Sequence, residues 1–325
     1  MKCTRLFLPT MMLWLLCLNC SFLSAQTSRT DSAAAYAARG SEWLKKGEYD
    51  RAIADFDLAL AFDARLADIY YSRAFARQAK ADLAGALADY DKAIALAPRF
   101  ADAYCNRGNV RMDMGDSESA IRDYSRALEI NPKMVEVWSN RSAVRRARGD
   151  LDGALSDCRE ALRLNPRLAA AWNNCGAVHF EKSETAEAFA AFNKAVALAP
   201  QQAAFYLSRG NVRMVMGEKS EAVADYDKAI SLNPRLAAAY YGRGIAQFGL
   251  GNRDAALADF SQAIALDPKL ANAYANRGAI RLMQGHLEEA AADFARCLAL
   301  DPSAKPMLDS YAEMFRRQRQ AKEPH

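Results

Sequence analysis

Seven prolines recur at an interval of 34 residues, and this period constrains the fold more than any other feature of the chain. A period of this length indicates a stack of similar structural units, each of which packs only against its neighbours. Counting back from each proline, and adding one upstream unit that has Ala64 in place of the proline, gives eight repeats over residues 33–304. The repeats begin at residues 33, 67, 101, 135, 169, 203, 237 and 271.

Positions within the repeat follow the spacing of α-helices. The fourth position is always aromatic, the eighth always small and the twentieth always alanine. Positions 4 and 8 share one face of a first helix, and positions 20, 24 and 27 share one face of a second helix. Glycine at position 15 is expected to end the first helix in the left-handed conformation, and the proline ends the second helix. The sequence therefore predicts an all-α chain of helix pairs.

This series of aromatic, small, alanine and proline positions resembles the tetratricopeptide repeat family over about 272 of the 325 residues. The resemblance implies antiparallel helix pairs stacked into a right-handed superhelical solenoid. It also implies a concave surface lined by the first helices, and proteins or peptides as ligands. One departure is position 11, where the family often has tyrosine and this chain mostly has arginine, as at Arg77, Arg111 and Arg145.

The first 25 residues have the layout of a secretory signal peptide. Lys2 and Arg5 precede the apolar run Leu6–Leu18, which is too short to span a membrane comfortably. A cut before Gln26 leaves residues 26–32 as a linker, and we expect an exported protein of the periplasm or cell envelope. One alternative is an uncleaved anchor. Another is a lipoprotein-type cut before Cys20, and a lipid anchor there is the only membrane contact we expect.

The chain after the eighth repeat is predicted to form one more helix. Residues 305–320 place Leu308, Tyr311, Ala312 and Phe315 on one face, as in a helix that caps the exposed core of the last repeat. The opposite face is basic, so a docking helix is the alternative. Residues 321–325 form a short tail.

Charge and motifs argue against nucleic-acid binding and catalysis. Removing Lys2 and Arg5 lowers the formal net charge from +4 to +2, which gives no electrostatic reason to bind nucleic acid. The three histidines are scattered, and we find no nucleophile motif, phosphate loop or metal-ligand spacing. We therefore expect no enzymatic activity, no cofactor and no metal.

Two recurring charged positions predict a structural ion pair. Position 7 is arginine and position 23 is aspartate in seven of the eight repeats, and the fifth repeat lacks both, with Cys175 and Ala191 instead. Because an unpaired half-buried charge is costly, this joint loss indicates a salt bridge between the two helices or across repeats. The fifth repeat also has Ser183 at position 15, which predicts a local change in the superhelix. For Cys158 and Cys175 we favour two small buried thiols over a disulfide.

In the family, positions 2, 5, 6, 9, 12 and 13 of the first helix face the concave side, and we call these positions the predicted binding face. Asparagine recurs there, and its amide both donates and accepts, which suits the backbone of an extended ligand. Aromatic residues on the same face are expected to select apolar side chains. One alternative is that the polar residues only keep the face hydrated. Another is a self-associating structural scaffold of the envelope. The candidate residues are Asn106, Asn109, Asn140, Asn174, Asn211, Asn276, Tyr71, Phe75, Phe180, Tyr241 and Phe248.

Overall fold

The computed structural model describes residues 31–320, of which residues 312 and 314–320 are described by their backbone alone. Every regular element in this range is a helix. The predicted signal peptide, including Cys20, lies outside the described residues. Among those described, no helix is long and apolar enough to cross a membrane.

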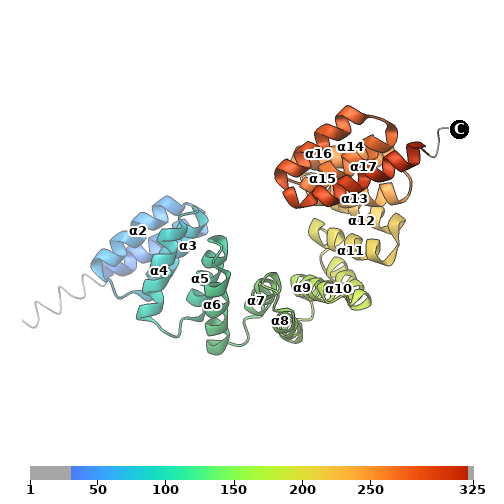
Figure 1. Cartoon of the computed structure of the whole chain (residues 1–325). Coiled ribbons are helices and arrows are strands. Elements are labelled where there is room, and N and C mark those ends of the chain that lie inside the picture. The colour runs from blue at the N-terminus through green and yellow to red at the C-terminus, as the bar shows by residue number, and fades with distance from the viewer. Residues whose placement is uncertain (1–30, 321–325) are drawn as a thin grey trace, which may run out of the picture. The chain divides into compact units, whose positions relative to one another are not determined.

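Each repeat contributes two helices, and the two helices of a repeat lie side by side wherever both belong to the same one of the two compact units described below (Figure 1). The first helices are residues 31–45, α3 (Ala67–Ala79), α5 (Ala101–Asp113), α7 (Val135–Ala147), α9 (Ala169–Glu181), α11 (Ala203–Met216), α13 (Ala237–Gly249) and α15 (Ala271–Gln284). The second helices are α2 (Tyr49–Phe62), α4 (Leu83–Leu96), α6 (Ser117–Ile130), α8 (Leu151–Leu164), α10 (Thr185–Leu198), α12 (Lys219–Leu232), α14 (Arg253–Leu266) and α16 (Leu287–Leu300). From α3 onward, the first helices begin at the residues where the proline period places the repeats.

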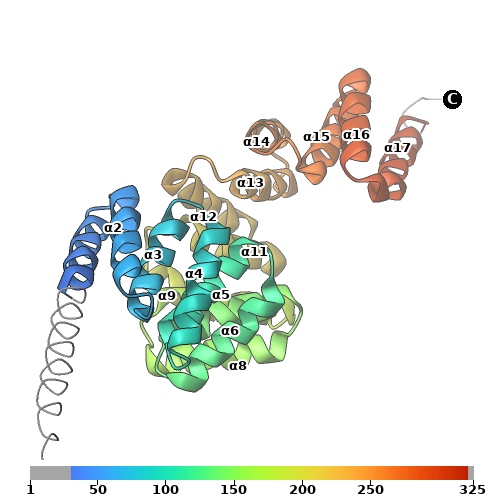
Figure 2. The same cartoon turned by 90° about the vertical axis from the view of Figure 1, so that its left-hand side faces the viewer.

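The chain divides into two compact units, Met1–Gly149 and Asp150–His325. The described part of the first unit runs from residue 31 to the end of α7, and the second unit begins with α8. Within each unit, a first helix packs on the second helix of its own repeat and on the second helix of the repeat before it, wherever these helices belong to that unit. Figure 2 shows this succession in the second unit, where the pair α13–α14 is followed by the pair α15–α16.

The core of every repeat except the fourth, which has Cys158 at position 24, is built from small residues around one aromatic ring. In the third repeat, Ala120, Tyr124 and Ala127 are buried on one face of α6. Gly108 of α5 lies opposite the tyrosine, and a Cβ atom there would approach Tyr124 Cε1 to 2.7 Å. The small residue at position 8 therefore lets the two helices come close enough to enclose the ring.

The turn inside each repeat is formed by a residue in the left-handed conformation. Glycine occupies this place in six repeats, for example Gly115 with φ of 82°. Ala81 and Ser183 adopt nearly the same angle, with φ of 62° and 61°. The turn of the fifth repeat therefore keeps this conformation at Ser183, and the expected local change in the superhelix stays a prediction.

The last helix, α17 (Lys305–Gln320), follows a short 3₁₀ turn, Pro302–Ala304, and packs against α15. Leu308 is buried there in a cluster with Ala275, Cys297 and Ala304, and Tyr311 packs beside it. This apolar contact covers the core of the eighth repeat. Figure 2 shows α17 at the end of the row of helix pairs.

Candidate functional site

In the first unit, the predicted binding face carries a chain of hydrogen bonds. Asn106 Nδ2 donates to Tyr71 Oη at 2.8 Å, across the boundary between the second and third repeats. Tyr124 Oη donates to Asn109 Oδ1 at 2.7 Å. Longer contacts of 3.5 Å join Asn109 Nδ2 to Asn106 Oδ1, and Asn140 Nδ2 to Asn109 Oδ1. The structure therefore brings three of the candidate asparagines together with two tyrosines.

This arrangement changes what the asparagines can offer to a ligand. Asn106 and Asn109 are half-buried, and each uses its amide to hold a tyrosine of the same unit. Asn140 is exposed, and its only described hydrogen bond lies at the long end of the normal range. Asn140 is thus the member of this row with most of its hydrogen-bonding capacity turned to solvent. The sequence pattern predicted the row but not the tyrosine partners.

The second unit repeats the same two pairings. Asn276 Nδ2 donates to Tyr241 Oη at 3.2 Å, with the same separation of 35 residues as Asn106 and Tyr71. Tyr226 Oη donates to Asn211 Oδ1 at 2.8 Å. Position 5 of one repeat and position 6 of the next are therefore joined in both units wherever tyrosine and asparagine coincide.

Asn174 belongs to the second unit, where it is half-buried on α9. The adjacent residue Asn173, also on the predicted binding face, has a different environment. Its Oδ1 atom is buried and has no hydrogen-bond partner among the described residues. A buried acceptor without a donor costs free energy, and an ordered water molecule is the usual partner of such an atom.

The five aromatic candidates differ in exposure. Phe75 and Phe248 remain 45% and 38% exposed, although they are large apolar side chains. The Tyr71 ring packs on Phe100 at 4.8 Å between centroids, and the Tyr241 ring packs on Phe260 at 5.9 Å. Phe180 packs against the buried cluster of Ala188, Phe192 and Val212. Among the five candidates, Phe75 and Phe248 are therefore the aromatic side chains that remain exposed to solvent.

Burial also sets the protonation of the polar groups on this face. It raises the pKa of the Tyr71 and Tyr241 hydroxyls, because their charged forms would lose solvation. The same effect raises the pKa of the Cys105 thiol to about 11. These groups are therefore neutral at pH 7, and the tyrosines can both donate and accept hydrogen bonds.

The predicted arginine–aspartate pair is present within the repeats. Arg73 donates to the Asp89 carboxylate from Nε at 2.9 Å and from Nη2 at 2.6 Å. Arg77, at position 11, donates to the same carboxylate at 2.9 Å. The arginines that replace the family's tyrosine at position 11 therefore add a second cation to the buried aspartate. The bidentate pairs are Arg39–Asp55, Arg73–Asp89, Arg107–Asp123, Arg209–Asp225, Arg243–Asp259 and Arg277–Asp293.

The same arginines also contact the preceding repeat, which sequence reasoning had left open. Arg73 donates from Nη1 to Asp57, and Arg107 donates to Asp91 at 2.6 Å. The partner is always position 25 of the repeat before. Where that position is not aspartate it is still polar, as with Asn193 for Arg209. The recurrence of aspartate at residues 57, 91 and 227 was a signal that could have predicted this contact.

Four family models of the tetratricopeptide repeat match the chain. They cover residues 101–134 and 237–270, residues 79–115 and 215–251, residues 144–203, and residues 271–304. Together they fall on the repeats whose helix pairs and core positions are described above. The chain belongs to the tetratricopeptide repeat family. Proteins of this family generally mediate protein–protein interactions, and the fold is typically a non-catalytic scaffold.

Solved structures show the same tetratricopeptide fold. A tetratricopeptide repeat protein from Parabacteroides merdae is 19% identical, with a TM-score of 0.63 over 76% of this chain and 98% of its own. The Cut9–Hcn1 hetero-tetramer of the APC/C is 19% identical, with a TM-score of 0.66 over 81% of this chain and 52% of that chain. The C-terminal part of a repeat protein from Cytophaga hutchinsonii is 18% identical, with a TM-score of 0.54 over 74% and 98%. No curated protein matches.

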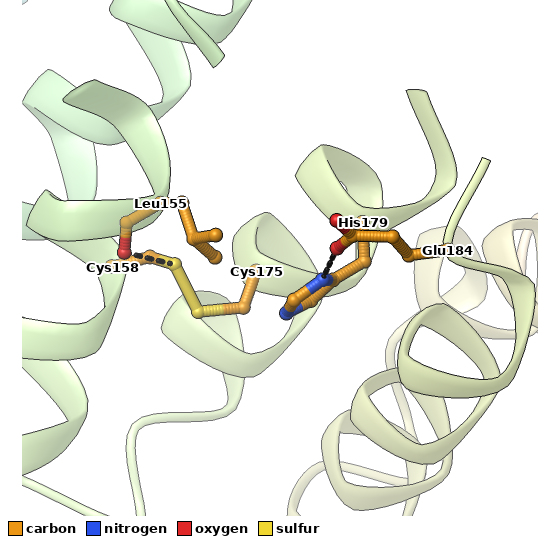
Figure 3. Close-up of a disulfide and its surroundings, with 5 residues drawn as sticks. All are labelled: Leu155, Cys158, Cys175, His179 and Glu184. Carbon is orange, nitrogen blue, oxygen red and sulfur yellow. Dashed lines mark hydrogen bonds and ion pairs between the residues drawn. A yellow bond between two sulfur atoms is a disulfide. The ribbon is translucent and has the colours of Figure 1, made fainter. Parts of the chain in front are cut away.

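A disulfide joins the fourth tetratricopeptide repeat to the fifth. Cys158 of α8 and Cys175 of α9 are bonded to one another, with their Cα atoms 5.6 Å apart (Figure 3). The preference for two free thiols was therefore wrong. Sequence spacing placed the cysteines on neighbouring helices, but only the packing of position 24 against position 7 of the next repeat brings their sulfur atoms into bonding distance.

Position 11 of the fifth repeat also has a different partner. His179 lies one turn after Cys175 on α9, and its Nδ1 is 2.5 Å from Glu184 Oε2 in the turn before α10 (Figure 3). Where position 11 is Arg77, Arg111, Arg213 or Arg281, it pairs with the aspartate of position 23, which in the fifth repeat is replaced by Ala191. Among residues 31–320, no group of three or more histidine, cysteine, aspartate or glutamate side chains could hold a metal ion.

Proposed function

We propose that this protein is a non-catalytic binding scaffold that acts outside the cytoplasm and holds an extended peptide or protein segment on the inner side of its first helices. The observation that carries the proposal is the exposure of Phe75 and Phe248 on the predicted binding face. Large apolar side chains that remain exposed beside polar groups are characteristic of binding surfaces.

Helical spacing places each exposed phenylalanine on the same face as a tyrosine–asparagine pair. Phe75 follows Tyr71 by four residues on α3, and Phe248 follows Tyr241 by seven residues on α13. Each unit therefore combines an apolar contact with neighbouring amide and hydroxyl groups. In the first unit, an extended segment would bury an apolar side chain against Phe75 and present its backbone to the exposed amide of Asn140. In the second unit, it would bury an apolar side chain against Phe248.

Export is part of the proposal, and the disulfide supports it. Disulfides persist in oxidising compartments and are rare in the cytosol, where thiols are kept reduced. A secretory signal at residues 1–25 and a Cys158–Cys175 bond are consistent with one another. The partner is accordingly expected among proteins of the periplasm or cell envelope.

The experiment begins with a pull-down from envelope extract, followed by titration calorimetry with the partner that it yields. Phe75→Ala and Phe248→Ala should each weaken binding by about 1–2 kcal/mol. Leu58→Ala is the matched control, because Leu58 is 42% exposed on a second helix, away from the predicted binding face. Equal affinity of both phenylalanine variants and the parent protein would place the contact elsewhere.

The asparagine row is tested in the same titrations. The variant Asn106→Ala/Asn140→Ala/Asn174→Ala should lose about 0.5–1.5 kcal/mol of binding free energy for each amide that contacts the ligand. Asn106 also holds Tyr71, so its replacement alone is compared for thermal stability. Gln201→Ala, an exposed amide in the loop before α11, is the control. If the triple variant folds and binds like the parent, the row is not a contact surface.

Light scattering distinguishes the adaptor from a self-associating scaffold. A monomer across the micromolar range supports the adaptor. A dimer that Phe75→Ala or Phe248→Ala dissociates would show that the binding face is occupied by a second copy of the chain.

A further inference from the structure

The contact between α8 and α9 lacks the ion pairs of position 7 that join other repeats, and keeps an exposed pair between Lys182 Nζ at the end of α9 and Asp152 of α8 at 2.7 Å. An arginine at position 7 normally contacts aspartate of its own repeat and position 25 of the repeat before. Here position 7 is Cys175, position 23 is Ala191, and position 25 of the preceding repeat is Arg159. An arginine in place of Cys175 would therefore meet Arg159 and find no carboxylate. None of the three residues needed for the ionic contact is present.

The disulfide occupies the same place in the repeat as the missing groups. Cys175 stands at the arginine position, and Cys158 stands at position 24, where all seven other repeats have an aromatic ring. Both cysteines are buried, in one cluster with Ala154, Leu155 and Val178. A single covalent bond thus replaces both the ion pair and the aromatic side chain that stabilise the other repeats.

We propose that the Cys158–Cys175 disulfide is a redox-dependent link between α8 and α9, whose reduction loosens α8 while the other helices of the second unit stay packed. The other contacts between repeats in this unit rely on charge pairs and apolar packing, which a thiol reagent does not alter. The contact between α8 and α9 alone depends on the oxidation state of its surroundings. Reduction leaves two small buried thiols in an apolar cluster, so the helices remain formed but lose their covalent constraint.

The chemistry requires a thiol reductant and a local opening. A dithiol attacks one sulfur as its thiolate and forms a mixed disulfide. Its second thiol then releases the protein as two thiols, while the reagent becomes a cyclic disulfide. Two electrons and two protons pass from the reagent to the protein. Because Cys158 and Cys175 are buried, attack on either sulfur needs a transient separation of α8 from α9.

Hydrogen exchange on the full chain tests the proposal, with dithiothreitol as the reductant and alkylation of both cysteines in denaturant as proof of reduction. The bond closes a loop with a sequence separation of 17 residues, so its loss should speed exchange of α8 amides on the order of a hundredfold. Amides of α12 to α16 should be unaffected. Unchanged exchange in α8 after complete reduction would overturn the proposal, as would an equal increase throughout the second unit.

Two variants distinguish the effect of breaking the disulfide from the effect of replacing the cysteine side chains. Cys158→Ala/Cys175→Ala should show fast α8 exchange with or without dithiothreitol. A second variant restores the pattern of the other repeats with Cys158→Phe, Arg159→Asp, Cys175→Arg and Ala191→Asp. It should keep α8 protected in dithiothreitol, because an ion pair replaces the bond. Sensitivity of either variant to dithiothreitol would contradict the proposal, and measurement on the parent protein remains decisive if a variant fails to fold.

Discussion

Arg107 holds the carboxylate of Asp123 with two parallel hydrogen bonds, from Nε at 2.9 Å and from Nη2 at 2.6 Å. The two side chains are only 14% and 4% exposed, so the pair is largely shielded from water. Arg107 also stacks over the Tyr104 ring at 5.3 Å. One guanidinium thereby connects the aromatic position of α5 to the buried aspartate of α6.

Removing the carboxylate should destabilise the third repeat strongly. Asp123→Asn leaves Arg107 and Arg111 without their shared counter-ion. We expect a loss of about 3 kcal/mol, at the lower end of the range for a broken buried pair, because Arg107 keeps its contact with Asp91. Urea unfolding, with hydrogen exchange to localise the change to α5 and α6, measures this effect.

Asp55→Asn is the comparison for that prediction. The Asp55 carboxylate is equally buried, but its partner Arg39 is 57% exposed and is hydrated without it. The loss of stability should therefore be clearly smaller than for Asp123→Asn. Equal losses would show that burial of the arginine does not set the strength of the pair.

Much of the fold could be predicted from the sequence because the same pattern of a helix pair recurs in eight repeats. The 34-residue period predicts where α3 and later first helices begin, and the joint loss at Cys175 and Ala191 predicts that arginine and aspartate meet. Eight copies allow each position to be compared with itself, which a single helix pair would not. The identification of an all-helical tetratricopeptide solenoid is confirmed by the family models and the structural relatives.

The candidate site was less predictable, because side-chain partners depend on packing across repeats. Tyr71 and Asn106 are 35 residues apart and meet only when α3 and α5 are adjacent. The repeat period and the helix face of an asparagine do not show whether its amide is free to bind a ligand or already hydrogen-bonded within the protein. The disulfide was not predicted for a related reason. No other pair of neighbouring repeats has cysteine at position 24 and at position 7 of the next repeat, so comparison among the repeats could not show that these two positions lie within bonding distance.

Replacing Ala81 by glycine should stabilise the second repeat. Ala81 has φ of 62°, a conformation that costs a residue with a Cβ roughly 1–2 kcal/mol. Glycine avoids this strain but loses roughly 0.5–1 kcal/mol more backbone entropy on folding. The net gain should be about 0.5–1 kcal/mol, seen as a higher Tm. Gly115→Ala is the reciprocal control at φ of 82° and should lower the Tm; shifts of the same sign would refute the argument.

The reactivity of Cys105 should follow its raised pKa. Burial, with a smaller contribution from Asp102, raises this pKa to about 11, so at pH 8 about one thiol in a thousand is ionised. Because only the thiolate reacts, alkylation by iodoacetamide should be slow at pH 8 and increase tenfold per pH unit up to about pH 11. For the chain unfolded in urea, the plot of alkylation rate against pH should have its midpoint near pH 8.5, the ordinary pKa of a cysteine thiol. A folded-state inflection near 8.5 would show that the thiol is solvated.

Export is tested at the N-terminus of the protein purified from its source. Mass spectrometry should find the chain beginning at Gln26, or at Cys20 carrying lipid. Replacing Lys2 and Arg5 by glutamate should lower the exported fraction, because the positive start of a signal peptide would be lost. Bulk protein that retains Met1 would contradict export by either route.

The contact between position 7 and position 25 has a consequence for how such a chain can change in length. At some junctions, position 25 of one repeat is aspartate and contacts the arginine at position 7 of the next, as with Asp57 and Arg73 and with Asp91 and Arg107. The contacting residues at these junctions are the same, so the repeats on either side could be exchanged without loss of the contact. A duplication or deletion of 34 residues between such repeats recreates a working junction. Arg159 and Cys175 do not match these residues, so a duplication or deletion of 34 residues between the fourth and fifth repeats would not recreate this contact. The disulfide therefore marks a junction between described repeats at which the exchange of one repeat for another would remove a covalent bond.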